Sequence, residues 1–179
     1  MLTAPCGQLL ILSRGFLIMP MPCHLTLVGE KQGKIEGSCD QKGREGTILV
    51  YELHHSVTIP RSPTDGLATG KRVHAPLTIV KEIDQSSPKL FQALCTGEHL
   101  KNVTLKYYRI TKQGTEEHYY TTTLEDAIIV SYNPVIPNTL LATSEPYKHM
   151  ESVSFTYKKI KVTWEATGIE AEDSWDVPR

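Results

Sequence analysis

Apolar and polar residues alternate along most of the chain, and this pattern changes to a helical spacing at one place. From Leu77 to Val80 and from Val103 to Tyr108 the apolar positions recur every second residue, which is the signal of a half-buried strand. Between these segments, Leu90, Phe91 and Leu94 lie three or four residues apart, so they would form the buried core face of a helix. The pattern predicts one short helix within a mostly antiparallel β structure.

The two ends of this helix also carry sequence signals. Ser86 can cap a helix by accepting a backbone N–H, and Pro88 suits the first helical position, where no hydrogen bond is lost. Gly97 supplies the left-handed residue that commonly ends a helix. We therefore expect a helix over residues 88–96, with its apolar face in the core. The polar residues expected on its outer side, free to face a neighbouring molecule, are Lys89, Gln92 and Glu98.

Two polar segments interrupt the strand pattern and are predicted to be long loops. Residues 30–46 are rich in glycine, and residues 60–75 are rich in proline and glycine; loops of this length are usually functional or mobile. In the last strand segment the apolar residues occupy odd numbers up to Tyr157 and even numbers from Ile160. Because a one-residue slip exchanges the two faces, this predicts a β-bulge at Lys158-Lys159 or a strand with both faces partly covered.

Composition places the chain among ordinary globular proteins. It has 179 residues, of which 40% are hydrophobic, and this suits a single domain with a sizeable core. The formal net charge of -1 gives no reason to expect a nucleic-acid partner, since such surfaces are usually basic. The 4 cysteines are scattered without a C-x-x-C pair, so neither a zinc site nor a dense disulfide framework is indicated. We expect synthesis in a reducing cytoplasm.

The first twenty residues need a separate interpretation. The segment from Gln8 to Ile18 is apolar, but Arg14 interrupts it and no basic region precedes it. It is much shorter than the roughly 20 apolar residues that span a bilayer. We expect neither a cleavable signal peptide nor stable membrane insertion; residues 1–20 would be a non-native or disordered extension, and residues 21–179 the domain. A working targeting segment is the alternative.

The search for catalytic, metal or cofactor sites gives none. The segment from Asp65 to Arg72 resembles a phosphate-binding loop, but only three residues separate Gly66 from Gly70 where the motif needs four. His54 and His55 are adjacent, so on a strand they would point to opposite faces and not bind one metal. No nucleophile motif of a hydrolase is present. The strand tyrosines and Trp164 leave a ligand-binding β domain as an alternative, although aromatic residues are simply good strand formers.

The ordered set of segments resembles the haemolysin-coregulated protein (Hcp) family of the bacterial type VI secretion system. The resemblance spans Met21 to Asp176. The segments that carry it are REGTILVYE (44–52), HSVTIP (55–60), TGKRVHAPL (69–77), KEIDQSSPKLFQAL (81–94), TGEHLKNVTLKYYR (96–109), YYTTTLEDAIIVSYNP (119–134), HMESVSFTYKKI (149–160) and EDSWD (172–176). Residues 1–20 have no counterpart in the family.

This resemblance implies a mainly β fold, a compact antiparallel β-barrel of two packed sheets with one short helix. It implies a tube subunit without catalytic activity or cofactor, assembled as a homohexamer whose rings stack. The implied partners are a VgrG-like spike protein, a contractile sheath and small effector proteins carried in the lumen, and the implied fate is secretion. A phage-type tail-tube protein is the nearest alternative, ahead of a monomeric ligand-binding domain or a small hydrolase.

Stacked rings need protruding loops, and the two predicted loops are the natural source of contacts. The charged residues on them are our candidates for polar contacts between subunits or between rings. These are Arg44, Glu45, Arg61, Asp65, Lys71 and Arg72. Solvated loop charge is the alternative interpretation for each.

Overall fold

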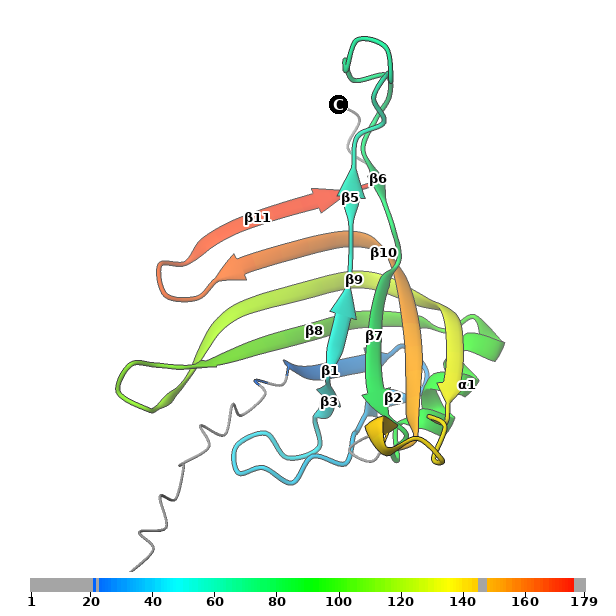
Figure 1. Ribbon diagram of the computed structural model, residues 1–179, viewed down its shortest axis with the longest axis vertical. Helices are drawn as coiled ribbons and strands as arrows, with labels where there is room; N and C mark the ends of the chain where they lie inside the picture. Colours follow the sequence, from blue (N-terminus) through cyan, green and yellow to red (C-terminus); the bar gives the residue numbers. More distant parts are fainter. Residues whose placement is uncertain (1–20, 22, 145–147, 176–179) are drawn as a thin grey trace, which may run out of the picture.

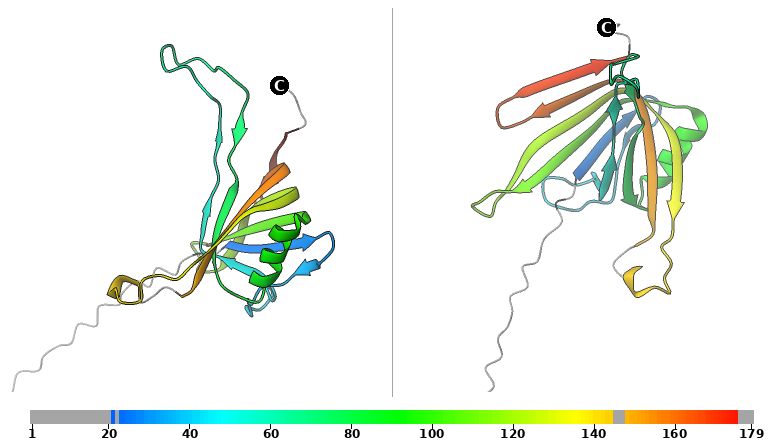
Figure 2. Two further views of the ribbon diagram at one scale, coloured as in Figure 1. Left: turned by 90° about the vertical axis from the view of Figure 1, so that its right-hand side faces the viewer. Right: turned by 45° about the horizontal axis from the view of Figure 1, so that its top comes forward.

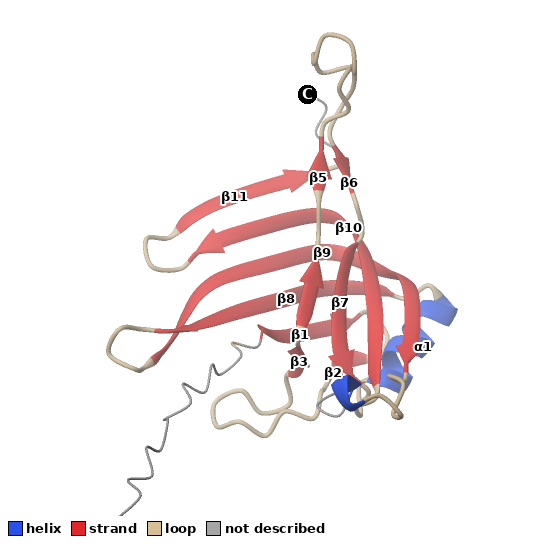
Figure 3. Cartoon of the chain, viewed as in Figure 1, coloured by secondary structure: helices blue, strands red, loops and turns tan. Residues whose placement is uncertain are grey.

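The computed structural model describes residues 21, 23–144 and 148–175, and the expectations for residues 1–20 lie outside this range. The described chain consists mainly of strands (Figure 3). In order they are β1 (Cys23–Gly29), β2 (Gly33–Ile35), β3 (Ile48–Val50), β4 (Glu52–His54), β5 (Val57–Thr58), β6 (Val73–His74), β7 (Leu77–Glu82), α1 (Ser87–Thr96), β8 (His99–Ile110), β9 (Glu116–Val135), the 3-10 helix η1 (Ala142–Ser144), β10 (Met150–Trp164) and β11 (Ile169–Ser174).

Nine of the strands form one strongly curved antiparallel sheet (Figure 1, Figure 2). Its order is β2-β1-β8-β9-β10-β7-β4, with β3 added to β1 and β11 added to β10. The short strands β3 and β4 pair with β1 and β7 at opposite sides of the sheet, and only Tyr51 separates them. This confirms the mainly β class. The strands are not closed into a barrel, and nine of them form one sheet where two packed sheets were expected; β5 and β6 pair separately.

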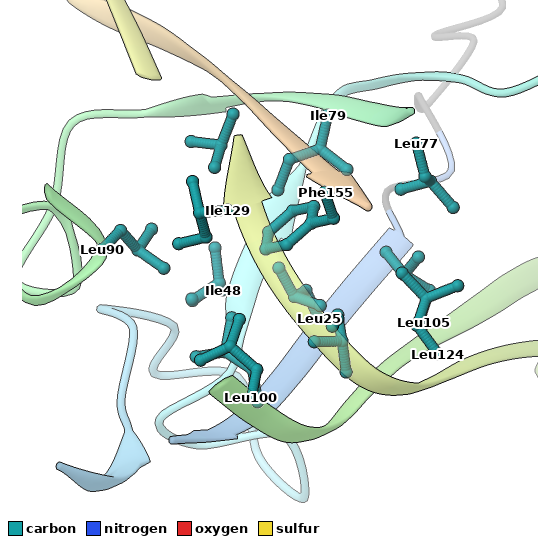
Figure 4. Packing of buried hydrophobic residues seen from close by; sticks show 14 of the residues in the cluster. Leu25, Ile48, Leu77, Ile79, Leu90, Leu100, Leu105, Leu124, Ile129 and Phe155 are labelled. Carbon is teal, nitrogen blue, oxygen red and sulfur yellow. The ribbon is translucent and has the colours of Figure 1, made fainter. Parts of the chain in front are cut away.

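The concave side of the sheet encloses the core, and α1 covers one end of it against β9 (Figure 4). Leu25, Leu105, Leu124 and Phe155 have no exposed surface and come from four different strands. Burying each such side chain contributes about 1.5–3 kcal/mol relative to leaving it in water. The alternation read from the sequence therefore identified the core face of these strands.

The prediction is wrong for one of the three residues expected on the buried face of the helix. Leu90 is fully buried and Leu94 is half-buried against the core, as expected, but Phe91 is 53% exposed. The buried position is taken by Ala93, because the inward face of α1 includes Ser87, Leu90 and Ala93. Phe91 lies at the side of that face, where its ring packs edge-on against Tyr132.

The start of the helix differs from the prediction, and its end agrees with it. Ser86 makes no side-chain cap; the Ser87 hydroxyl instead accepts the N–H of Asp84 at 2.9 Å. Gly97 has φ 61 and ends the helix as predicted. Glu98 was expected to face outward, but it is 4% exposed. Its carboxylate accepts the backbone N–H groups of Lys31 and Gln32 at 2.8 and 2.9 Å, which fixes the β1–β2 turn.

The long strand β10 has both faces partly covered along its length. Tyr157 is 5% exposed on one face and Ile160 is 7% exposed on the other. The register shift against β9 lies between Ser154 and Phe155, so the bulge expected at Lys158-Lys159 is not where the pairing slips. Ile160 is covered by residues of β5, β6 and β11, with which it lines a cavity. This second covered face explains why the apolar residues change from odd to even numbers along β10.

Candidate functional site

The two loops that carry the candidate contact residues lie at opposite ends of the subunit (Figure 1). The segment from His55 to Ala75, which we call the β5–β6 hairpin, projects from the sheet as a narrow ribbon at one end. Residues 36–47 and the β9–β10 connection around η1 lie at the other end. The hairpin carries Arg61, Asp65, Lys71 and Arg72, and the opposite end carries Arg44 and Glu45.

The tip of the hairpin is exposed and turns on its own backbone. Arg61 forms an isolated bridge with Ala68, and the Asp65 carboxylate accepts the N–H of Leu67 at 3.1 Å. That N–H lowers the pKa of Asp65. Gly66 has φ 73, a conformation that favours glycine. The sequence that resembles a phosphate-binding loop is thus the turn of a β-ribbon, with the side chains of Arg61, Asp65 and Lys71 in solvent.

Two of the six candidates are bound within their own subunit. The Arg44 guanidinium lies 3.4 Å from the centre of the Tyr108 ring and 2.9 Å from a carboxylate oxygen of Glu116. Arg72 pairs with the Asp173 carboxylate and donates to the carbonyl of Ser174 at 2.7 Å. Both side chains therefore hold a loop in place, while Glu45, Arg61, Asp65 and Lys71 are exposed.

A cluster of four polar residues ties the base of the hairpin to β10 and β11. We call it the hairpin-root cluster: His55, His74, Tyr157 and Asp173. The Tyr157 hydroxyl lies 2.6 Å from His55 Nε2 and 2.8 Å from His74 Nδ1. His74 Nε2 lies 2.9 Å from Asp173 Oδ2. The hairpin therefore stands on a continuous chain of hydrogen bonds that joins four separate segments.

The environment of this cluster sets the protonation of three members. Burial, and then the neighbouring His74, lower the pKa of His55. Burial, and then Asp173, raise the pKa of Tyr157 to about 12. Burial opposes ionisation of Asp173, but hydrogen bonds from Arg72 and His74 outweigh it and lower the pKa of that carboxyl. At neutral pH the cluster holds a carboxylate, a phenol and a neutral His55.

Sequence reasoning missed this cluster because its members are far apart in the chain. His54 and His55 do separate as expected: His54 points outward to Glu52 at 2.5 Å, and His55 turns to Tyr157. The sequence signal that could have indicated this cluster was the presence of one histidine at each end of the long loop. His55 precedes β5 and His74 ends β6, where the register pairs it with Val57.

A second polar cluster lies where β7 meets the start of α1. We call it the helix-end cluster: Lys81, Asp84, Ser87, Tyr132 and Glu151. Lys81 Nζ lies 2.7 Å from Glu151 Oε1 and 2.9 Å from Asp84 Oδ1. Tyr132 donates its hydroxyl to Glu151 Oε2 at 2.6 Å, and Ser87 donates to Oε1 at 2.9 Å. Lys81 and Glu151 are 0% and 1% exposed, so this cluster is a sealed structural joint.

The aromatic residues considered as a ligand platform pack against each other across strands. The rings of Tyr107 and Tyr120 are 5.3 Å apart, and those of Tyr119 and Trp164 are 5.6 Å apart, both edge-on. In the part of the chain that the structure describes, no group of three or more metal-ligating side chains comes together. Nor is any helix there long and apolar enough to cross a membrane.

Comparison with protein families and characterised sequences gives a consistent result. The family model described as "Type VI secretion system effector, Hcp" matches residues 25–164. The chain is 41% identical over 169 residues to the "Major exported protein" of Pseudomonas aeruginosa, covering 89% of this chain and 98% of that protein.

Solved structures agree with the sequence relatives. A mutant form of Hcp1 from the E. coli EAEC 042 pathovar has a TM-score of 0.77 at 37% identity, covering 87% of this chain and 99% of that one. The secreted protein Hcp3 of Pseudomonas aeruginosa has a TM-score of 0.73 at 36% identity, covering 88% and 99%. A further Hcp crystal structure reaches a TM-score of 0.82 at 30% identity, again covering 88% and 99%.

Proposed function

Since the chain belongs to the Hcp family of type VI secretion proteins and serves as a subunit of the secretion tube, we propose that it forms six-membered rings that stack head to tail around a channel. The observation that carries this proposal is the difference between its two ends. A projecting hairpin at one end and a group of loops at the other (Figure 1) form a heterologous pair of surfaces, which generates repeating assemblies.

Apolar side chains are exposed at both ends. On the hairpin, Ile59 is 57% and Leu67 is 67% exposed. At the opposite end, Ile136 is 64% and Leu140 is 92% exposed. Beside them lies an apolar groove of about 320 Å³. It is lined by Val80, Val135, Pro137, Ser144, Met150, Glu151 and Ser152. Exposed apolar surface of this kind usually marks a protein contact, so we assign the hairpin of one ring to the groove-bearing end of the next.

The exposed charged candidates surround these apolar residues. Arg61, Asp65 and Lys71 on the hairpin and Glu45 at the other end contact the neighbouring ring in this arrangement. Arg44 and Arg72 act indirectly, because each holds one of the two loops against its own subunit. Reversing the charge of Arg44 or Arg72 would therefore perturb the subunit itself, so the exposed residues are the better probes of assembly.

Contacts within a ring are proposed at the ends of the sheet. In the described chain β2 pairs with β1 alone and β11 with β10 alone, which leaves one side of each strand for a neighbour. Side-by-side packing covers such edges, which are otherwise a liability for aggregation. The chain is secreted as a tube component; we further propose that it works without catalysis, is made without a cleavable signal peptide, and meets a spike, a sheath and small effectors.

Native mass spectrometry and negative-stain microscopy of the purified protein test the proposal. We expect a species of six times the subunit mass and ring particles with a central hole, and stacked rings at high concentration. A monodisperse monomer at high concentration would contradict it. Lys71→Glu should leave rings intact and reduce stacking. The matched control is Lys112→Glu, the same charge change in the exposed β8–β9 turn at the side of the subunit, which should change neither.

A further inference from the structure

We infer that the hairpin-root cluster is a proton-sensitive anchor: it holds the β5–β6 hairpin on β10 and β11 while its two histidines are neutral, and releases the hairpin when both take up a proton. Its consequence for ring stacking rests on the proposed function. The anchor itself is a property of the single subunit and can be tested there.

The hydrogen-bonding capacity of the four groups allows one complete arrangement with neutral imidazoles. Asp173 accepts only, so His74 Nε2 donates to it and His74 Nδ1 is left as an acceptor. The Tyr157 hydroxyl donates to His74 Nδ1 at 2.8 Å and accepts from His55 Nε2 at 2.6 Å. A proton on His74 Nδ1 turns that atom into a donor, and the Tyr157 hydroxyl can then donate only to His55 Nε2. Once both imidazoles are protonated, the hydroxyl faces two donors and has no acceptor left in the chain of bonds.

The surrounding charges make double protonation unfavourable in the closed state. Arg72, directly before β6, neutralises Asp173 from β11, and Lys159 from β10 pairs with Glu172 at 2.8 Å. Glu125 of β9 lies 3.8 Å from the same lysine. Asp173, the carboxylate in contact with His74, is therefore already paired with a cation. The centres of the His55 and His74 rings are 6.2 Å apart, so two imidazolium ions there would repel each other and Arg72.

The hairpin depends on its base for its direction. Beyond β5 and β6, which have two residues each, every residue from Ile59 to Lys71 is exposed except the half-buried Ser62. The ribbon stands clear of the sheet in the left view of Figure 2. A change at the root therefore moves the whole tip, since few other contacts resist it. Imidazoles ordinarily titrate between about pH 5 and pH 8, so mild acid is the relevant trigger.

Hydrogen exchange of the isolated subunit tests the anchor, with mass spectrometry used to follow the hairpin. Within the hairpin, the Ala75 N–H bonds to the Ser56 carbonyl at 2.9 Å, directly beside His74 and His55. This bond should fray when the cluster no longer holds the base of the hairpin. After correction for intrinsic rates, the peptide that contains Ala75 should exchange about tenfold faster at about pH 5 than at about pH 7.5, because each proton that the open state binds and the closed state does not shifts the opening equilibrium tenfold per pH unit. The double variant His55→Gln/His74→Gln should lose this pH dependence.

The matched control is His54→Gln. His54 is the chain neighbour of His55, but its side chain is 68% exposed and pairs with Glu52, so its loss should leave the pH response intact. Unchanged protection of the wild-type hairpin across this range would overturn the inference. So would an equal acid response in the double glutamine variant. If that variant does not fold, Tyr157→Phe takes its place and should exchange fast already at neutral pH.

Trp175 supplies a second, optical readout. Its ring centre lies 5.2 Å from that of His74, and in Trp164→Phe it is the remaining one of 2 tryptophans. Its fluorescence should change with acid together with hairpin exchange; a change without faster exchange would show protonation without release and refute the anchor. Tubes are examined separately by microscopy. Stacking lost in acid while rings persist supports the link to assembly, and a subunit that never forms rings bears only on the proposed function.

Discussion

The helix-end cluster and the hairpin-root cluster are both built on β10, yet they suit opposite purposes. Glu151 near the start of the strand is sealed from solvent with Lys81. Tyr157, farther along the same strand, joins two histidines beside a cavity of about 270 Å³. The first cluster uses lysine and carboxylates, which ordinarily titrate far from neutral pH, and the second uses imidazoles, which titrate near it. Strand β10 thus holds α1 through lysine and carboxylate groups and holds the β5–β6 hairpin through imidazole groups.

The strongest way to break the first cluster is to remove its cation. Lys81→Met leaves the buried Glu151 and the partly buried Asp84 without their positive partner. Breaking a buried ion pair on one side costs about 3–5 kcal/mol, and we expect a loss of that size in denaturant unfolding. The control is Lys89→Met on the outer side of α1, which should stay within about 0.5 kcal/mol. If Lys81→Met changed the free energy of unfolding as little as Lys89→Met does, the helix-end cluster would not be sealed from solvent.

Acid should separate the two clusters by the pH at which each weakens. Despite opposition from burial, hydrogen bonds from Ser86 and Lys81 lower the pKa of Asp84 from 3.8. Its stabilisation is therefore present above pH 3.8 and is lost only as pH falls through the lower folded value. Burial lowers the pKa of His55 from 6.5, so its contribution is complete above pH 6.5 and declines below it.

A third group contributes to global stability in the same window. Burial, and then Arg44, lower the pKa of His24 from 6.5 to about 4. Each histidine that must take up a proton on unfolding adds a slope of about 1.4 kcal/mol per pH unit. We expect the free energy of unfolding to decrease between pH 6.5 and about 4. A flat wild-type curve in denaturant titrations would contradict the assignment of neutral, buried histidines.

The periodic part of the fold was predictable from the sequence, and the polar joints were not. Alternation identified buried strand residues such as Leu105, and helical spacing placed Leu90 and Leu94 correctly. The prediction that Phe91 lies in the core is wrong because spacing alone does not say which side of a short helix faces the core. The prediction that Glu98 faces outward is wrong because a carboxylate can be buried when it accepts hydrogen bonds from backbone N–H groups.

The candidate site shows the same division between local and distant information. Loop positions and the exposure of Arg61, Asp65 and Lys71 follow from local glycine and proline content. The commitment of Arg72 to Asp173 does not, because these residues are 101 positions apart. Only the folded arrangement, in which the base of the hairpin lies beside the end of β11, joins them (Figure 1).

A milder change sharpens the comparison at the second cluster. Tyr157→Phe removes the hydroxyl shared by His55 and His74 but keeps the ring. A hydrogen bond of this kind contributes about 0.5–1.5 kcal/mol, so we expect a loss of about 1 kcal/mol in denaturant unfolding, together with loosening confined to the hairpin. Tyr119→Phe, whose ring packs on Trp164, is the control. An effect as large as that of Lys81→Met would mean that the hairpin root supports the whole subunit.

The smallest expected effect lies at the exposed part of the hairpin. Lys71 is exposed and belongs to neither cluster, so Lys71→Glu should change the free energy of unfolding by less than about 0.5 kcal/mol. If the same variant nevertheless reduces ring stacking, this part of the hairpin acts between molecules and not within one. Thermal unfolding and sedimentation of the same sample measure the two quantities together. A large loss of stability with unchanged stacking would reverse this division and place Lys71 among the structural elements of the subunit.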